Sequence, residues 1–424
     1  MKPGRPEAVL VYADLDHFDD PIRMGSLRRQ TARAGDILSF EYDPGWLQKP
    51  EAFTFDPDLA LVQGPQYPGP DRANFGVFLD SSPDRWGRVL MQRRENMRAR
   101  RDGRRARSLT DWDFLLRVHD ETRLGALRFQ DSDSGRFIDS DEQFAAPPIT
   151  SLRALQAASL DFESHADQEE HPDYERWVSQ LFAPGSSLGG ARPKASVRDE
   201  EGVLCLAKFP SRQDRRDVGA WELVAQRLAA KAGIQVPHTR ALHIPGSDYT
   251  TFLAQRFDRT PEGRRLAFVS AVTLTQHNDG EAGVSYLELV DLLQSQGANT
   301  RRDCSELFRR VVFSILIHNT DDHLRNHGFF IGERGISLSP AYDINPSNDR
   351  NELSLAINEV DTTCDVAIAV EASAAYGLSK LEADEILRRS TTAVASWRKE
   401  ATRLRIPRTE QNLMAPAFEP LRSV

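Results

Sequence analysis

Short runs of alternating apolar and polar residues predict β-strands near the beginning of the chain. Residues 8–12 and 37–42 have this pattern, and Pro- and Gly-rich connections such as GPQYPGPD accompany them. A helix is expected to open after the turn at residues 81–84 and to continue from Trp86. The stretch 160–175 is acidic and has few large apolar residues, which is typical of an exposed loop or a helix margin.

Near residue 180 the pattern changes to strand, turn, strand and helix. Residues 194–197 and 203–209 flank Gly202, so we expect them to form a β-hairpin. Asp217 can cap a helix whose apolar residues keep helical spacing, and Gly233 stands where that helix would stop.

After a further strand at residues 249–254, the part beyond residue 260 is largely helical in pattern. One helix face is formed by Leu307, Val311, Val312, Ile315 and Leu316. The sequence Ser379-Lys-Leu-Glu382 has the form of a capping box that opens a long helix. We therefore expect an α+β fold in which a strand-rich part precedes a mainly helical part.

Composition indicates a globular protein of more than one packed unit. The chain has 424 residues, of which 40% are hydrophobic and 28% charged, enough for two or three units. Its longest apolar run, residues 311–317, is far shorter than the roughly 20 residues that a membrane-spanning helix needs. The amino terminus lacks the core of a signal peptide, and the three cysteines stand alone. We expect a cytoplasmic protein outside the membrane.

One basic run opposes the overall charge of the chain. The net charge of −9 argues against a surface built wholly for nucleic acid. Between Arg93 and Arg107, however, eight arginines stand against Glu95 and Asp102. This run could attract a phosphate backbone, and therefore DNA, or an acidic partner. A solvated helix face followed by a loop explains it equally well.

The most specific chemistry lies in HNTDDHLRNHGFFIGERGISLSPAYDI, residues 318–344. Asp321 is followed five positions later by Asn326, and Asp343 stands at the end of the second of two further β-like runs. Phosphoryl transfer from a nucleotide needs a carboxylate that orients the attacking hydroxyl group. It also needs an asparagine and a second carboxylate that hold magnesium. These three residues could supply all of these groups.

Two other interpretations of this segment remain open. Each of the three residues could be an ordinary turn residue. The histidines and aspartates of residues 318–327 could also bind a transition metal, as in a metal-dependent hydrolase. The sequence lacks a second cluster that would complete such a site, so we favour phosphoryl transfer.

Upstream, Lys208 could contribute to a nucleotide site. It shares a strand face with Leu204 and Leu206, so its ammonium group is expected in a partly apolar cleft, where it needs an anionic partner. Glu222, one turn into the next helix, could be that partner, and nucleotide phosphates could take the remaining donors. A lysine that merely reaches to water is the commoner case.

A loop of small residues precedes this hairpin. It has the sequence SSLGGARPK, residues 186–194, and it contains Gly189 and Gly190. Backbone amides could approach a phosphate closely at such a loop. Two adjacent glycines are weak evidence when taken alone.

Six motifs in this order and spacing resemble the ATP-site motifs of HipA-type kinases. They are SSLGGARPK, CLAKFP, AWELVAQRLAAKAGIQVP, LAQRFDR, HNTDDHLRNHGFF and LSPAYDI. FEYDPGWL and VFLDSSPDRWGR are similar to the first subdomain of that family, so the resemblance covers most of the chain. It implies a protein-kinase-like two-lobed fold, with a small N-terminal β subdomain at 1–150, a strand-rich lobe at 151–260 and a helical lobe at 261–424.

The resemblance also implies roles for individual residues. Asp321 would be the catalytic aspartate, and Asn326 and Asp343 would hold Mg²⁺. Lys208 would bind the phosphates of ATP, with Glu222 nearby. Further ATP-binding positions would be Gly189, Gly190, Gln255, Phe257 and His323. Ser187, or its neighbour Ser186, would be an autophosphorylation site whose modification displaces the loop and switches the kinase off.

The motifs depart from those of ordinary protein kinases. The loop lacks GxGxxG, the catalytic segment lacks HRD, and Asp343 is followed by Ile-Asn rather than Phe-Gly. Activation-loop control of the familiar type is therefore not expected. His323 stands where a lysine often stabilises the transferred phosphate, so Arg325 or Lys194 could serve instead.

Three functions from different classes follow. The first is an ATP- and Mg²⁺-dependent serine/threonine kinase that acts as a growth-arresting toxin. The resemblance implies that its substrates include aminoacyl-tRNA synthetases and that its partner is a HipB-like helix-turn-helix antitoxin, through which it would contact DNA indirectly. The second is a small-molecule phosphotransferase, which would not explain the loop serine. The third is a non-catalytic partner of a DNA-binding antitoxin.

Overall fold

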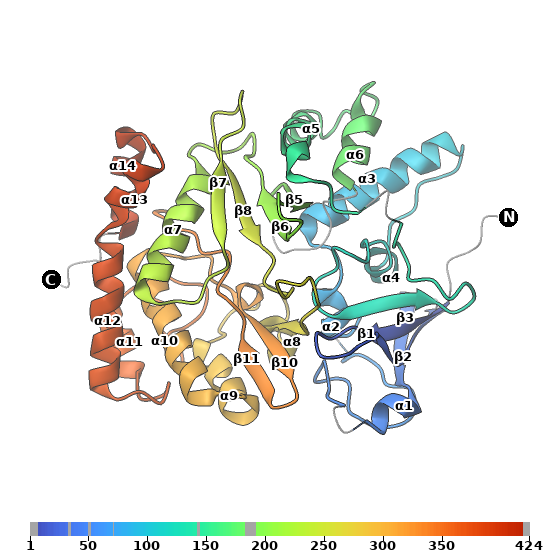
Figure 1. Ribbon diagram of the computed structural model, residues 1–424, viewed down its shortest axis with the longest axis horizontal. Helices are drawn as coiled ribbons and strands as arrows, with labels where there is room; N and C mark the ends of the chain where they lie inside the picture. Colours follow the sequence, from blue (N-terminus) through green and yellow to red (C-terminus); the bar gives the residue numbers. More distant parts are fainter. Residues whose placement is uncertain are drawn as a thin grey trace. The chain divides into compact units, whose positions relative to one another are not determined.

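The chain folds into two compact units. A computed structural model describes residues 7–32, 35–49, 52–70, 72–141, 145–182 and 192–418. Unit 1 consists of Met1–Arg212 and Asp258–Val269, and unit 2 consists of Gln213–Phe257 and Ser270–Val424. Figure 1 follows the chain through both units by colour. The predicted division into three functional segments, with bounds at residues 150 and 260, stays a prediction.

Unit 1 contains an antiparallel sheet, a β-hairpin and a group of helices (Figure 1). Its strands are β1 (Ala8–Ala13), β2 (Ile22–Ala32), β3 (Gly35–Tyr42), β4 (Leu127–Asp131), β5 (Lys194–Arg198) and β6 (Leu204–Lys208). Its helices are α1 (Pro44–Leu47), α2 (Gly76–Asp80), α3 (Arg85–Arg101), α4 (Asp111–Leu115), the 3₁₀-helix η2 (Ile149–Ser151), α5 (Leu152–Ser164) and α6 (Tyr174–Phe182). The first four strands form one sheet in the order β3-β2-β1-β4, and β5 pairs with β6.

Local signals account for most of these elements. Residues of β1 alternate between buried and half-buried, as the sequence pattern predicts. Helix α3 begins where expected, because the Asp84 side chain accepts a hydrogen bond from the Gly87 amide at 2.8 Å. The prediction of an exposed loop or helix margin at 160–175 is largely confirmed. Residues 160–164 end α5, residues 174 and 175 begin α6, and the loop between these helices covers residues 165–173, although Phe162 and Tyr174 are buried.

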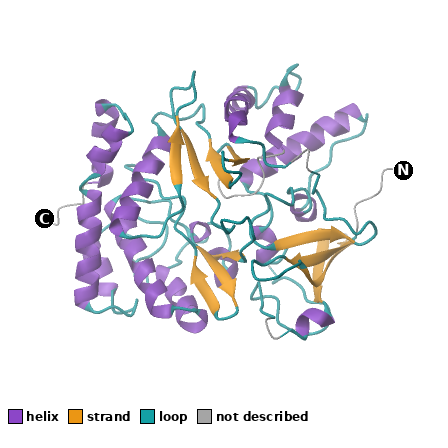
Figure 2. Cartoon of the chain, viewed as in Figure 1, coloured by secondary structure: helices purple, strands orange, loops and turns teal. Residues whose placement is uncertain are grey.

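Unit 2 is mainly helical (Figure 2). Its strands are β7 (Thr239–Leu242), β8 (Thr251–Gln255), β10 (Gly328–Gly332) and β11 (Gly335–Leu338), while β9 (Phe268–Ser270) lies at the boundary of the units. Its helices are α7 (Val218–Ala232), α8 (Ala271–Thr275), α9 (Tyr286–Gln296), α10 (Thr300–Leu316), η3 (Leu324–Asn326), α11 (Val366–Ala372), α12 (Lys380–Val394), α13 (Trp397–Arg403), α14 (Arg408–Met414) and η4 (Ala415–Phe418). Strand β7 pairs with β8, and β10 with β11.

The helix signals of unit 2 are confirmed. Asp217 caps α7 through the Ala220 amide at 3.1 Å, and Gly233 ends this helix in a left-handed conformation with φ of 93°. Ser379 opens α12 with a capping box. Helix α10 is buried over most of its length and packs against both α9 and α12. It therefore provides a fixed support for the loop that follows Leu316.

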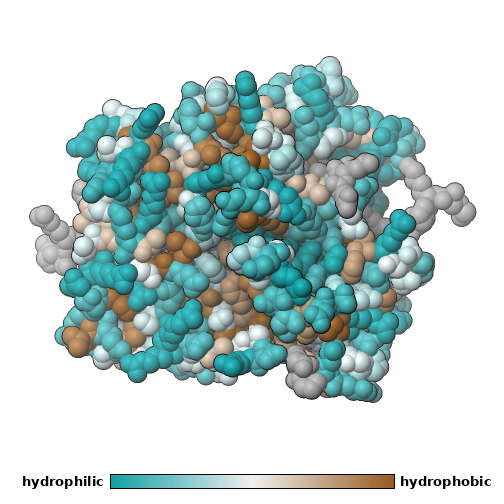
Figure 3. Space-filling model, in the orientation of Figure 1, coloured by the Kyte–Doolittle hydropathy of each residue, from teal (hydrophilic) through white to brown (hydrophobic). Residues whose placement is uncertain are grey.

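The described residues include no helix that is long and apolar enough to span a membrane. On the face in Figure 3, hydrophilic residues cover most of the surface and hydrophobic ones are in small groups.

Charged side chains that bind backbone groups join Asp258–Val269 to the rest of unit 1. Asp258 accepts a hydrogen bond from the Gly125 amide at 2.8 Å. Arg259 donates to the carbonyl oxygen of Glu121 at 3.0 Å. Arg265, which is buried, donates to the carbonyl oxygen of Asp120 at 2.6 Å and lies 3.7 Å from the Asp120 carboxylate.

We predict that Arg265→Met lowers the free energy of unfolding by about 2–4 kcal/mol, because it leaves the buried Asp120 carboxylate and a carbonyl with fewer partners. Urea unfolding followed by circular dichroism measures this loss. Arg136→Met is the control, since Arg136 is exposed in unit 1. An equal effect of both substitutions would contradict a structural role of Arg265.

Candidate active site

Asp321 and Asn326 lie on one compact loop after α10. His318 turns the chain with a left-handed φ of 49°. The His323 amide donates to the Asp321 carbonyl at 3.1 Å, and the Asn326 amide donates to the His323 carbonyl at 2.8 Å. Across the loop, the Asn326 side-chain nitrogen donates to the Asp321 carbonyl at 2.9 Å. The structure therefore brings these two predicted residues together.

Asp343 lies beyond the β10–β11 hairpin and not at its end. Strand β11 ends at Leu338, so the expected position of Asp343 at the end of the second strand was wrong. Asp343 has a left-handed φ of 56°, a conformation that costs free energy for residues other than glycine and that is often found at functional sites. The Asn345 side chain supports it by donating to Oδ1 of Asp343 at 3.0 Å.

Two hydrogen bonds connect the Asp321 loop to the Asp343 segment. The hydroxyl group of Tyr342 donates to the carbonyl oxygen of Arg325 at 2.8 Å. The Asn345 amide donates to Oδ1 of Asn319 at 3.0 Å. Tyr342 precedes Asp343 and Arg325 precedes Asn326, so a side-chain hydrogen bond joins the residues next to the two predicted magnesium ligands.

The adjacent residues Asp321 and Asp322 have opposite environments. Asp321 is exposed, and its carboxylate has no hydrogen bond or ion pair among the described residues. Asp322 is buried and accepts hydrogen bonds from the hydroxyl groups of Tyr286 at 2.7 Å and Ser314 at 3.1 Å. Nε2 of His327 lies 3.0 Å from the other carboxylate oxygen. Asp321 is thus the carboxylate that can face a substrate.

The pKa of Asp322 reflects these contacts. Burial alone would raise it, but the charge of His327 and the hydrogen bonds to the carboxylate outweigh burial and lower the pKa below its usual range. Asp322 is therefore held as a buried anion.

Of the predicted phosphate-binding residues, two can be located. Lys208 is half-buried at the end of β6, where it pairs in register with Lys194. Glu222 is buried on α7. Lys208 belongs to unit 1, and Glu222 belongs to unit 2. Ser186, Ser187, Gly189 and Gly190 lie outside the described residues.

The predicted adenine-binding residues are on the same unit as Asp321. Gln255 ends β8, and its amide donates to the carbonyl oxygen of His238 at 2.9 Å. The Phe257 ring packs against the ring of Tyr342, with centroids 5.3 Å apart. Phe257 therefore lies beside the residue that precedes Asp343. Tyr342 was not singled out from the sequence, because one tyrosine in an irregular segment carries no periodic signal.

His323 lies within the Asp321 loop. Its Nδ1 atom is buried and has no hydrogen-bond partner in the part of the chain that the structure describes.

Lys194 and Arg325, the two side chains that could stabilise the transferred phosphate in place of a lysine at position 323, differ in environment. Nζ of Lys194 lies 2.9 Å from Asp84, and both side chains are buried. This pair fixes β5 to the start of α3 within unit 1. Arg325 is half-exposed, and its guanidinium group lies 3.2 Å from the exposed carboxylate of Asp279. Arg325 is therefore the more available of the two.

Most arginines of the run 93–107 have partners within unit 1. Arg93 and Arg100 pair with Glu169, Arg104 with Glu95, and Arg107 with Asp113. Arg101 lies 3.9 Å from Asp102, and Arg94 stacks over the Phe182 ring at 3.7 Å. Arg98 and Arg105 make no such contact with the described residues. Five of the eight arginines thus pair with four carboxylates, and the run keeps an excess of positive charge. Its role as a basic surface stays a prediction.

The transition-metal interpretation finds no support in the described residues. They contain no group of three or more His, Cys, Asp or Glu side chains that could hold a metal ion. The histidines make other contacts instead. Nδ1 of His318 lies 2.9 Å from the carbonyl oxygen of Ala417, and His327 faces Asp322.

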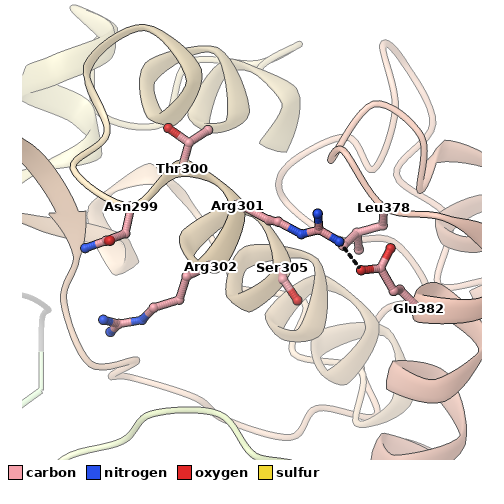
Figure 4. A pocket seen from close by; sticks show the side chains of 7 residues that line it. All are labelled: Asn299, Thr300, Arg301, Arg302, Ser305, Leu378 and Glu382. Carbon is pink, nitrogen blue, oxygen red and sulfur yellow. Dashed lines mark hydrogen bonds and ion pairs between the residues drawn. The ribbon is translucent and has the colours of Figure 1, made fainter.

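A surface pocket at the other end of α10 is separate from this loop. Figure 4 shows the side chains that line it, with Arg301 reaching Glu382 at 2.8 Å. The pocket surrounds the first turn of α10, whereas the Asp321 loop follows its last turn. The seventeen residues of this helix separate them by about 25 Å.

Comparison with known proteins places the chain in a family. The model of the HipA-like C-terminal domain matches residues 186–397, which is half of the chain. The chain belongs to this family.

Relatives found by sequence include a protein named as a kinase and one named as a toxin. A protein of Haemophilus influenzae named "Putative kinase" is 25% identical over 180 residues, which are 38% of this chain and 52% of that protein. The Toxin YjjJ of Escherichia coli is 28% identical over 186 residues, which are 41% of each chain. The matches thus span about half or less of these relatives.

A solved structure covers nearly the whole chain. It is HipA from Shewanella oneidensis in a complex with HipB and operator DNA, with a TM-score of 0.64 and 16% identity over 97% of this chain and 95% of that one. This likeness confirms the predicted α+β, kinase-like HipA fold.

We predict that Tyr342→Phe lowers the free energy of unfolding of unit 2 by about 1 kcal/mol, because it removes the hydrogen bond to the Arg325 carbonyl. Chemical denaturation measures the change. Tyr67→Phe is the matched control, since Tyr67 is 57% exposed. An unchanged stability of Tyr342→Phe would show that the hydroxyl group does not join the two segments.

Proposed function

We propose that this protein is an ATP- and magnesium-dependent serine/threonine protein kinase that acts as a growth-arresting toxin. One observation carries the proposal: two hydrogen bonds join the Asp321–Asn326 loop to the segment of Asp343, in a chain of the HipA-like C-terminal domain family. Phosphoryl transfer needs these three groups on adjoining loops.

The residues fit a magnesium site by their chemistry. Asn326 and Asp343 offer amide and carboxylate oxygens, which are the ligands that Mg²⁺ prefers. The side-chain nitrogen of Asn326 donates to the Asp321 carbonyl, so the side-chain oxygen of Asn326 points away from that carbonyl and can bind a metal ion. Bound magnesium would neutralise charge on the nucleotide phosphates. The left-handed backbone of Asp343, supported by Asn345, aims its carboxylate before any ligand binds.

Asp321 is the proposed catalytic residue. Its exposed carboxylate accepts a hydrogen bond from a substrate serine or threonine hydroxyl group and orients the oxygen toward the phosphate. A side chain on a protein surface can reach an exposed carboxylate without entering a deep cavity. Lys208 binds the ATP phosphates, and Phe257, Gln255 and His323 line the nucleotide site. Ser187 is the site of autophosphorylation.

A helix-turn-helix antitoxin is the proposed partner. The solved HipA of Shewanella oneidensis is in a complex with HipB and operator DNA, which supports a HipB-like partner for this chain. Contact with DNA is then indirect, through this antitoxin. Its protein substrates, proposed from the family resemblance, include aminoacyl-tRNA synthetases.

We predict that Asp321→Asn and Asp343→Asn each reduce phosphate transfer at least about 100-fold, since each removes a group that acts on the transferring phosphate. Incubation with labelled ATP and Mg²⁺, followed by phosphosite mapping, measures transfer to Ser187. Asp291→Asn is the control, because Asp291 is exposed on α9.

Expression in bacterial cells gives a second measurement. The wild-type chain and the Asp291 variant should arrest growth, while the Asp321 variant should not. Transfer that persists in Asp321→Asn would reject the assignment of this residue, and no transfer by the wild-type chain would reject the kinase function.

We predict that Arg325→Met lowers kcat about 10-fold or more with little change in the KM for ATP, because the guanidinium group stabilises the transferred phosphate. Asp279→Asn should retain or raise kcat, since it releases Arg325 from its ion pair. Steady-state kinetics on both variants test this role. A wild-type kcat in Arg325→Met would exclude it.

A further inference from the structure

A buried contact closes the Asp321 loop at its base. Asp322 follows Asp321, and His327 follows Asn326, so the contact of 3.0 Å between Asp322 and His327 joins the residues next to both proposed functional groups. The separation of Asp321 and Asn326 along the loop is thereby fixed from inside the protein. We propose that Asp322 and His327 are positioning residues that hold Asp321 and Asn326 in the geometry for phosphoryl transfer, an inference that rests on the proposed function.

The two sides of this contact are anchored to different elements. The Asp322 carboxylate accepts hydrogen bonds from Tyr286 at the start of α9 and from Ser314 near the end of α10. The carbonyl oxygen of His327 accepts a hydrogen bond from the amide of Ala271, the first residue of α8, at 2.9 Å. Three helices of unit 2 thus determine the position of one short loop.

Burial makes the arrangement hard to distort. Asp322, His327, Tyr286 and Ser314 are all buried. A carboxylate that moved away from its partners inside the protein would lose the interactions that compensate for its lost hydration. Nε2 of His327 lies 3.0 Å from the Asp322 carboxylate without the alignment of a linear hydrogen bond, so the packing around the two buried side chains holds them in contact.

The neighbouring aspartates therefore have separate tasks. Asp321 is exposed and can touch substrate, whereas Asp322 is enclosed and acts through the backbone it shares with Asp321. A shift of about 1 Å in a reacting group can reduce turnover about 100-fold. A loop of six residues that has a functional group at each end needs such a constraint, because its own backbone hydrogen bonds are few.

Steady-state kinetics on Asp322→Asn, His327→Gln and the double variant test the proposal. Each single substitution should lower kcat about 100-fold while the KM for ATP stays within about threefold, because the nucleotide site remains. The kcat of the double variant should lie within about threefold of the kcat of the slower single variant, since the two residues form one contact. Losses that multiply would overturn the proposal.

Tyr376→Phe is the matched control. It removes a buried hydrogen bond of the same unit, from the Tyr376 hydroxyl group to the carbonyl oxygen of Ile357, and leaves Asp322, His327 and their partners intact. It should lower the melting temperature about as much as Asp322→Asn and keep kcat within about threefold of the wild type. If kcat falls equally in both variants, Asp322 contributes stability alone and the proposal fails.

Hydrogen exchange separates this inference from the proposed function. In the wild-type chain without nucleotide, the amides of His323, Asn326 and His327 are bonded within the loop. Asp322→Asn should increase exchange of the 321–327 peptide about 10-fold or more, and Tyr376→Phe should change it little. This result would stand even if the chain transferred no phosphate. Unchanged exchange in Asp322→Asn would overturn the positioning role.

Discussion

The buried carboxylate of Asp322 is the constraint on which the candidate site depends. An anion inside a protein needs partners on several sides, and here they come from α9, α10 and the far end of its own loop. Because these partners fix the Asp322 side chain, the backbone of the neighbouring residues Asp321 and His323 can move little. Asp321 is consequently presented to solvent by a backbone that the interior controls, although the only regular structure in this loop is the short 3₁₀-helix η3.

A second constraint acts on Asp343. Its left-handed backbone is unfavourable for an aspartate, and it persists because Tyr342 and Asn345, on either side of it, are bonded to the Asp321 loop. Phe257 packs against the same tyrosine, so the segment that follows β8 contacts the residue that precedes Asp343. The proposed metal-binding and adenine-binding residues are thus part of one packed arrangement within unit 2.

Much of the fold could be predicted because its signals are local. Asp84, Asp217 and Ser379 each mark a helix start within four residues, and Gly233 marks a helix end. The three candidate residues of the site were found from their spacing. The role of Asp322 could not be found in this way, since Tyr286 is 36 positions away. The error at Asp343 has a similar cause, because the end of a strand depends on its pairing partner and not on its own composition.

The return of Asp258–Val269 to unit 1 has a consequence for biosynthesis. Buried groups of that unit, such as the backbone around Asp120, receive their donors from Arg259 and Arg265, which the ribosome adds about 140 residues later. Unit 1 therefore cannot mature while it is the only part of the chain that has emerged. All of α7, β7 and β8 must be synthesised before unit 1 receives its last donors, so this unit matures only after the first part of unit 2 has been made.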